Sequence, residues 1–381
     1  MMRLRSKLPD VGTTIFSVMS ALAGQHGAIN LSQGFPDFDV NPELIDAVAD
    51  AMRRGHNQYA PMPGVMALRE AISDRVLDLY GTRYDPESDI TVTAGATEAV
   101  FGVIAAVVGR DDDVIVIEPA YDAYEPAIRL AGGRARFVKL QYPEYTVDWD
   151  AVSDAVTPKT RLLIINSPHN PTGMALCEKD IDALVSLTAD TDLVILSDEV
   201  YEHIIFDGRR HQSMARHPEL ARRSFVVSSF GKTYHATGWK IGYCIAPGPL
   251  TAELRKIHQY ITFAANTPIQ TALAEFMARS RDHLDLAGFY QAKRDLFRKL
   301  TEPSRFKVLE CQGTYFQMLD YSGITDEPDV DVARRLTATH GVAAIPPSVF
   351  YKDGDDHRVL RFCFAKSDET LTLAGERLCR L

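Results

Sequence analysis

Three residues with chemically useful side chains follow apolar runs of the sequence at similar intervals. Asn170 lies 28 residues before Asp198, and Asp198 lies 34 residues before Lys232. Each interval is about the length of one βαβ unit, so the three residues are predicted at the same edge of one parallel sheet. A carboxylate at such a place needs a cation or a strong donor, and a lysine amine can form an imine with a carbonyl compound. These residue types therefore point to covalent chemistry on a carbonyl ligand.

An anion site is predicted in front of these residues. Residues 93–98, Thr-Ala-Gly-Ala-Thr-Glu, join a predicted strand to an apolar helix. Gly95 would let the backbone approach a ligand closely, and the free N–H groups at a helix start favour an anion. An anion pocket, an amide, a carboxylate and a lysine amine together fit pyridoxal 5′-phosphate. A nicotinamide enzyme would instead carry Gly-x-Gly-x-x-Gly after its first strand, and the sequence has no such motif there.

Each of these residues also has an ordinary structural explanation. Gly95 can form a turn, and Thr97 and Asp198 can cap helices. The segment around Asn170 has a common turn composition, and Lys232 can be a solvated surface lysine. Their joint placement at one sheet edge is what favours a ligand site.

The chain as a whole resembles the fold-type-I, class I/II pyridoxal-phosphate aminotransferases, from about residue 13 to the last predicted helix. The subgroup that it resembles contains methionine aminotransferases and kynurenine–oxoglutarate or glutamine transaminases. The motifs that carry the resemblance are S-Q-G-F-P-D-F (32–38), N-Q-Y-A-P (57–61), T-A-G-A-T-E (93–98), P-A-Y-D-A-Y (119–124), S-P-H-N-P-T-G (167–173), S-D-E-V-Y-E (197–202), S-S-F-G-K-T (228–233), T-G-W-K-I-G-Y (237–243) and R-F-C-F-A-K (361–366).

The resemblance implies a role for each residue around the cofactor. Lys232 would form the Schiff base and move a proton between the substrate α-carbon and the cofactor. Asp198 would pair with the ring nitrogen, while Asn170 and Tyr201 would bond the ring hydroxyl and Tyr121 would stack on the ring. The phosphate would be held by Gly95, Ala96, Thr97, Ser229 and Lys240. Many relatives have arginine at the position of Lys240, but a lysine can still bind phosphate as a point charge.

The resemblance also implies a substrate site and a partner. Arg361 would clamp the substrate α-carboxylate, helped by Asn170 and by the backbone around Gly34, because a guanidinium matches a carboxylate with two parallel bonds. Tyr59 would reach the phosphate of the neighbouring subunit, so the expected active unit is a homodimer with a shared site. The donor side chain would meet apolar or aromatic residues, namely Ile15, Phe16, Phe263 and Tyr121.

The expected reaction moves an amino group to a 2-oxo acid by a ping-pong route. Methionine is the first choice of donor, followed by aromatic or glutamine-like amino acids, because a dicarboxylate would need a second fixed cation. A cysteine-S-conjugate or cystathionine β-lyase is the main alternative, since it shares the fold but releases pyruvate and ammonia. A non-enzymatic regulator on this fold normally carries an added DNA-binding domain and is less favoured.

The elements that must position these residues follow from the hydrophobic pattern. Strands are predicted at 90–93, 114–117, 135–139, 162–165, 193–196 and 225–228, with helices at 96–108, 122–130 and 178–188 between them. Further helices are predicted at 43–53, 65–79, 249–262, 268–278 and 284–300. The last part predicts strands at 306–310, 315–319 and 359–364 and helices at 330–340 and 369–380. The fold is therefore predicted as α/β, with a large domain of mostly parallel sheet at 41–282 and a small α+β domain from 1–40 and 283–381.

Composition excludes several other classes of protein. The 381 residues carry a net charge of −10, which disfavours nucleic acid as a partner. Five cysteines without a C-x-x-C pair indicate reduced thiols and predict neither disulfides nor a metal site. Basic residues near the N-terminus followed by the apolar residues 15–23 imitate a signal peptide, but Pro9 and Asp10 interrupt this pattern. We therefore predict that residues 15–23 form a helix of the mature protein. We expect a cytoplasmic enzyme without a membrane span.

Overall fold

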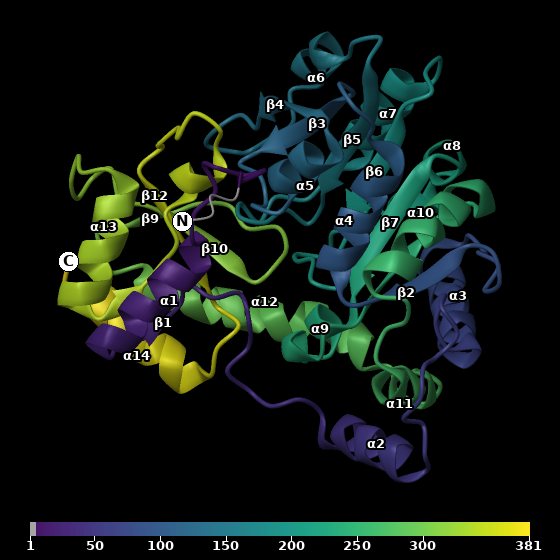
Figure 1. The fold of residues 1–381 in the computed structure, drawn as a ribbon. Coiled ribbons are helices and arrows are strands. Elements are labelled where there is room, and N and C mark those ends of the chain that lie inside the picture. The colour runs from purple at the N-terminus through teal and green to yellow at the C-terminus, as the bar shows by residue number, and fades with distance from the viewer. Residues whose placement is uncertain (1–4) are drawn as a thin grey trace.

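A mostly parallel sheet with helices on both faces dominates the computed structural model, which describes residues 5–381 (Figure 1). The strands of this part of the chain are β1 (Ile29–Asn30), β2 (Ile90–Thr93), β3 (Asp113–Glu118), β4 (Arg134–Lys139), β5 (Thr160–Asn166), β6 (Val194–Asp198), β7 (Ser224–Ser229), β8 (Gly242–Ile245), β9 (Lys307–Val308), β10 (Phe316–Asp320), β11 (Val342–Ala343) and β12 (Val359–Cys363). The α-helices are α1 (Ile15–His26), α2 (Pro42–Arg53), α3 (Met66–Tyr80), α4 (Ala96–Val107), α5 (Tyr124–Ala131), α6 (Trp149–Ala155), α7 (Glu178–Thr188), α8 (Pro218–Ala221), α9 (Phe230–Thr233), α10 (Gly248–Ile261), α11 (Thr267–Met277), α12 (Asp282–Thr301), α13 (Asp329–Arg335) and α14 (Asp368–Leu378).

The large sheet has the strand order β2-β8-β7-β6-β5-β3-β4 within the described residues. Strands β4, β3, β5, β6 and β7 are parallel neighbours, whereas β8 runs antiparallel to both β7 and β2. The six strands predicted in this region correspond to β2–β7, so the predicted α/β class is confirmed. Strand β8 was not predicted, because it follows β7 after only short helical turns and therefore breaks the strand–helix alternation.

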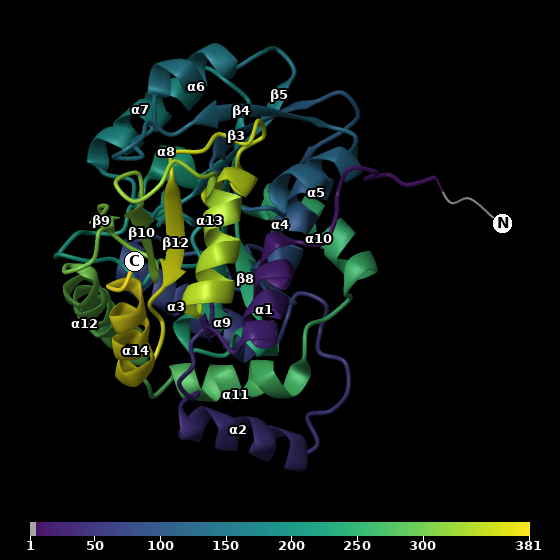
Figure 2. The same ribbon diagram turned by 90° about the vertical axis from the view of Figure 1, so that its left-hand side faces the viewer.

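Helices cover both faces of the large sheet, so the residues of a central strand are buried although alternate side chains point to opposite faces. In β3, Val114 and Val116 join a core with α4, α5 and α10, whereas Ile115 and Ile117 join a core with α3, α7 and α11. Helices α2 and α11 lie side by side at one end of the molecule in both views (Figures 1 and 2). The double cover fixes the strand ends from which the candidate residues emerge.

A third core joins the first and last parts of the chain. The antiparallel sheet β12-β10-β9 packs with α1, α12 and α14 (Figure 2). Strand β1 pairs in parallel with β11. Helix α1 covers the predicted segment 15–23 and is capped by Thr14, whose hydroxyl accepts the N–H of Ser17. The predicted helix 330–340 is observed as α13 followed by a π-helical turn, Leu336–His340.

Two negative observations apply to residues 5–381. None of the helices found there is long and apolar enough to span a membrane. Nor does this part of the chain bring together three or more histidine, cysteine, aspartate or glutamate side chains in a way that could hold a metal ion.

Candidate active site

A cavity of about 230 Å³, partly open to solvent, lies where the carboxyl ends of the parallel strands meet the third core. The predicted site residues that line it are Phe16, Gly34, Gly95, Ala96, Thr97, Tyr121, Asn170, Asp198, Tyr201, Ser229, Lys232, Lys240 and Arg361. Residues that were not predicted also line it, namely Gln33, Val100, Asn166, Val200, Thr237, Ile241 and Phe316. The cavity therefore joins most of the predicted residues in one place.

The ends of β5 and β6 are held together by Asn166. In the sheet register Asn166 is opposite Asp198, and its Nδ2 donates to the Asp198 carbonyl oxygen at 2.9 Å. Its Oδ1 accepts the backbone N–H of Asn170 at 2.8 Å. Asn166 thus fixes the loop that carries Asn170 against the strand that carries Asp198. Asn166 was not predicted as a site residue, although it directly precedes the motif S-P-H-N-P-T-G. Its position at the end of a predicted strand could have indicated its role.

Asp198 keeps a buried carboxylate at the end of β6. The Tyr124 hydroxyl donates to its Oδ2 at 2.7 Å, and the Val200 N–H donates to its Oδ1 at 3.5 Å. Burial raises the pKa of Asp198 to about 6, against the lowering effect of these donors. Since the contact with the Val200 N–H is long, Oδ1 can accept a further, stronger hydrogen bond. Tyr124 was not predicted, although it is the second tyrosine of the P-A-Y-D-A-Y motif.

Lys232 presents its amine to the cavity from α9, directly after β7. Its Nζ lies 2.8 Å from the Tyr315 hydroxyl oxygen and donates to the Gly34 carbonyl oxygen at 3.2 Å. Burial lowers the pKa of this amine to about 8. At pH 7 roughly a tenth of the amine is then neutral, compared with less than a thousandth for an ordinary lysine. The neutral form is the one that attacks a carbonyl carbon.

The start of α4 combines free backbone N–H groups with a nearby lysine. Gly95 precedes the helix with φ 81°, and no side chain among residues 5–381 caps the free N–H groups. A Cβ atom at Gly95 would lie 3.5 Å from Nζ of Lys240, which places that ammonium beside the helix start. Gly242 of β8 makes this arrangement possible, because a Cβ there would come within 2.8 Å of the Ala96 nitrogen. The free N–H groups and the lysine fit a phosphate.

Arg361 is a fully buried cation on β12. Its Nη1 donates to Asn170 Oδ1 at 2.7 Å, and its Nη2 donates to the Ser32 carbonyl oxygen at 2.8 Å. The guanidinium lies 3.9 Å from the centre of the Phe316 ring, and its Nε has no hydrogen-bond partner within the described part of the chain. Burial lowers its pKa to about 10, so it stays charged at neutral pH. A buried charge with an unpaired donor suits a carboxylate ligand.

Three predicted site residues do not line the cavity of the single chain. Tyr59 is 84% exposed and Phe263 is 46% exposed, and their rings contact edge to face with centroids 5.5 Å apart. Ile15 packs against the third core. Neighbouring residues of a helix point in different directions, so Phe16 reaches the cavity and Ile15 does not.

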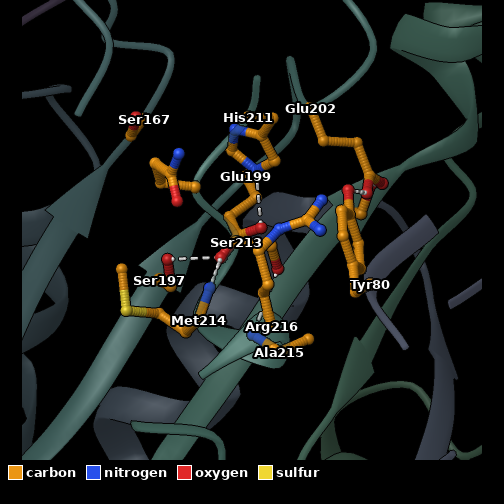
Figure 3. A network of polar contacts seen from close by, with 12 residues as sticks. Tyr80, Ser167, Ser197, Glu199, Glu202, His211, Ser213, Met214, Ala215 and Arg216 are labelled. Atoms are coloured by element: carbon orange, nitrogen blue, oxygen red, sulfur yellow. Dashed lines mark hydrogen bonds and ion pairs between the residues drawn. The ribbon is translucent and has the colours of Figure 1, made fainter. Parts of the chain in front are cut away.

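A buried network behind the cavity supports β6 and β7 (Figure 3). Glu199 accepts hydrogen bonds from the Ser197 hydroxyl at 2.8 Å and the Met214 N–H at 3.0 Å, and it pairs with His211 Nε2 at 2.8 Å. Glu202 accepts hydrogen bonds from three hydroxyl groups, those of Tyr80, Ser228 and Tyr243. Because Ser228 precedes Ser229, which was predicted to hold the phosphate, this network fixes the end of β7.

Comparison with known proteins identifies relatives over almost the whole chain. Residues 26–378 match the family model of class I and II aminotransferases. Methionine aminotransferase of Escherichia coli K12 is 51% identical over 99% of this chain and 98% of its own length. Kynurenine–oxoglutarate transaminase of Dictyostelium discoideum is 34% identical over 97% of this chain and 94% of its own length. A crystal structure of the E. coli methionine aminotransferase superposes with a TM-score of 0.98 at 50% identity, over 100% of both chains.

Proposed function

The chain belongs to the class I and II aminotransferase family, and from this premise we propose that it transfers the amino group of methionine to a 2-oxo acid. It is an aminotransferase with the fold-type-I architecture, as the sequence resemblance predicted. The β-lyase alternative is not favoured. Aminotransferases of this family depend on pyridoxal 5′-phosphate and act on amino acids and 2-oxo acids.

We propose that the cavity holds pyridoxal 5′-phosphate. The supporting observation is that the buried Lys232 amine, the Asp198 carboxylate and the Arg361 guanidinium all line one cavity with the uncapped start of α4. Asp198 would hold a proton on the ring nitrogen, Tyr121 would contact the ring, and Asn170 and Tyr201 would bond the ring hydroxyl. The phosphate would be held by Gly95, Ala96, Thr97, Ser229 and Lys240. When bound, the cofactor supplies an electron sink for the bond that breaks at the substrate α-carbon.

On the substrate side, different residues bind the substrate and transfer the proton. Arg361 binds the α-carboxylate, and its bonds to Asn170 and to the Ser32 carbonyl fix the guanidinium plane before substrate arrives. The backbone around Gly34 completes this carboxylate site. Lys232 takes the proton from the α-carbon and returns it, which its lowered pKa favours near neutral pH.

The choice of methionine rests on the walls of the cavity and on the named relatives. Phe16, Val200, Ile241 and Phe316 give the cavity apolar walls. The cations that line it within residues 5–381 are Arg361, Lys232 and Lys240, and each already has a proposed partner. A second carboxylate on the donor would therefore be buried without a cation. A flexible thioether adapts to such walls.

We also propose the domain and subunit organisation. The large domain spans 41–282, and 1–40 with 283–381 form the small domain, which agrees with the shared core of α1, α12 and α14. Aminotransferases of this family are generally dimeric. We propose a homodimer in which Tyr59 and Phe263, exposed in the single chain, contribute to the site of the second copy.

The test is turnover with methionine and a fixed 2-oxo acid. We expect 2-oxo-acid-dependent loss of the amino group, and no release of pyruvate and ammonia when a cysteine conjugate replaces methionine. The Lys232→Ala variant should lose the covalent, borohydride-reducible attachment of the cofactor while keeping its fold. A reducible linkage in that variant would show that another lysine carries the cofactor.

A further inference from the structure

Tyr315 contacts the amine of Lys232 and has no part in the function proposed above. Its side chain is fully buried just before β10, and its hydroxyl oxygen lies 2.8 Å from Lys232 Nζ. The same hydroxyl donates its proton to the carbonyl oxygen of Gly34. Because that proton is engaged, the lone pairs of the phenol oxygen are free to accept a hydrogen bond from the amine.

The amine therefore has two acceptors that do not belong to its own element. Lys232 comes from α9 after β7, whereas Tyr315 lies just before β10 and Gly34 lies in the segment after β1. The carbonyl of Gly34 accepts directly from Lys232 Nζ at 3.2 Å. The rings of Tyr315 and Tyr201 are perpendicular, with centroids 5.1 Å apart, and lie 5.4 Å and 5.6 Å from Nζ. These contacts define one position for a free amine.

We propose that Tyr315 is a positioning residue that, together with the Gly34 carbonyl, holds the amine of Lys232 whenever it is not bonded to cofactor. This inference rests on the proposed function, since Lys232 alternates between bound and free states only if it carries the cofactor. A lysine side chain has a flexible four-carbon stem. Without hydrogen-bond acceptors, its free amine would move away from the position from which it exchanges the α-proton. Gly34 is also a proposed part of the substrate site, so the docked amine stays beside the substrate.

The charged groups around Lys232 determine what loss of the Tyr315 hydroxyl would do. Burial, Arg361 and Lys240 disfavour the charged amine, and Cys363 and Asp198 favour it. Burial also raises the pKa values of Tyr315 and Tyr201 far above neutrality, so both phenols stay uncharged. A neutral hydroxyl that accepts from the amine stabilises the ammonium form more than the neutral form. Removing this acceptor should therefore lower the pKa of Lys232 below about 8.

The experiment compares Tyr315→Phe with Tyr290→Phe. Tyr290 is a matched control, because it is also fully buried, lies 5.7 Å from Tyr315 between ring centroids, and has a hydroxyl without a partner in the described residues. The full chain is freed of cofactor, and the rate of covalent attachment of pyridoxal 5′-phosphate is measured against pH. We expect a midpoint near pH 8 for the wild type and for Tyr290→Phe. For Tyr315→Phe we expect a midpoint about one pH unit lower, which is a tenfold change in the amine equilibrium.

A second measurement separates positioning from a structural effect. In the loaded enzymes, Tyr315→Phe should lower kcat on the order of tenfold with little change in KM for the amino acid, since the substrate carboxylate is held by other residues. An unshifted midpoint in Tyr315→Phe, or an equal shift in Tyr290→Phe, would overturn the assignment of Tyr315. A wild-type chain that never attaches the cofactor at Lys232 would instead contradict the proposed function.

Discussion

At the scale of single residues, burial moves the two central ionisable groups toward their neutral forms. It raises the pKa of Asp198 to about 6 and lowers that of Lys232 to about 8. At neutral pH the carboxylate is still mostly charged, and the amine has a usable neutral fraction. These are the states needed to hold a proton on a ring nitrogen and to attack a carbonyl carbon.

The Asp198→Asn variant tests the proposed role of the carboxylate. A neutral amide cannot keep a ring nitrogen protonated, so we expect kcat to fall by about 100-fold or more while the cofactor still attaches to Lys232. The measurement is single-turnover reaction of methionine, with borohydride trapping as the check on attachment. Near-normal turnover would remove Asp198 from this role.

The same variant gives a pH signature in the cofactor-free chain. The folded pKa of Asp198, about 6, lies above the value of 3.8 for an exposed aspartate. The folded state therefore binds more protons between these values, and the contribution of Asp198 to stability is complete below pH 3.8 and lost as the pH rises through 6. The free energy of unfolding of wild type minus that of Asp198→Asn should fall by about 2 kcal/mol from pH 4 to 7, measured in urea. A difference independent of pH would mean that the carboxylate is not buried in this way.

Arg361→Lys tests the carboxylate clamp. Lysine cannot reproduce the two bonds to Asn170 and Ser32 and still present a planar fork to the substrate. We expect kcat/KM to fall for every amino-acid donor, regardless of its side chain. The loss should correspond to about 2–5 kcal/mol of transition-state stabilisation. A loss confined to one donor would place the carboxylate elsewhere.

At the scale of elements, the strand ends were predictable and the supporting side chains were not. Apolar runs followed by Asn170, Asp198 and Lys232 carry a local signal, because strand, residue type and spacing are all visible in sequence. Tyr315 carries no such signal, since a phenol becomes significant here only through its contacts with distant segments. Asn166 lies at a strand end, but its role depends on its contacts with Asp198 and Asn170. Strand β8 is four residues long and lacks a preceding long helix, so alternation could not reveal it.

The network around Glu202 is an element-scale feature whose removal should affect stability. Glu202→Gln keeps the shape but replaces one acceptor oxygen with a donor, so the hydrogen bonds from Tyr80, Ser228 and Tyr243 cannot all be kept at full strength. We expect a loss of about 1–3 kcal/mol in the free energy of unfolding, measured in urea. The exposed Glu369→Gln is the control and should change stability little. Equal stability of both variants would show that the network does not hold β7.

At the scale of the whole molecule, the cavity draws on parts that are distant in sequence. Phe16 comes from α1, Phe316 from β10 and Ile241 from the segment before β8. The resemblance led to Phe16 but could not show that its neighbour Ile15 faces the core. The direction of α1 depends on its packing against Leu336–His340 and β11, which a local pattern does not contain. Donor selectivity is therefore a property of the assembled fold.

The donor side chain provides the whole-molecule prediction. Apolar walls and cations that are all engaged favour methionine, phenylalanine, kynurenine or glutamine over aspartate. One methylene in an apolar pocket changes binding by only about 1–3 kcal/mol, so several donors should react with graded kcat/KM values and methionine should be the best. The measurement is kcat/KM for these five amino acids with one fixed 2-oxo acid. Aspartate as the best donor would contradict this prediction, because its side-chain carboxylate would then need a further cation, beyond Arg361, Lys232 and Lys240, that residues 5–381 of the single chain do not place in the cavity.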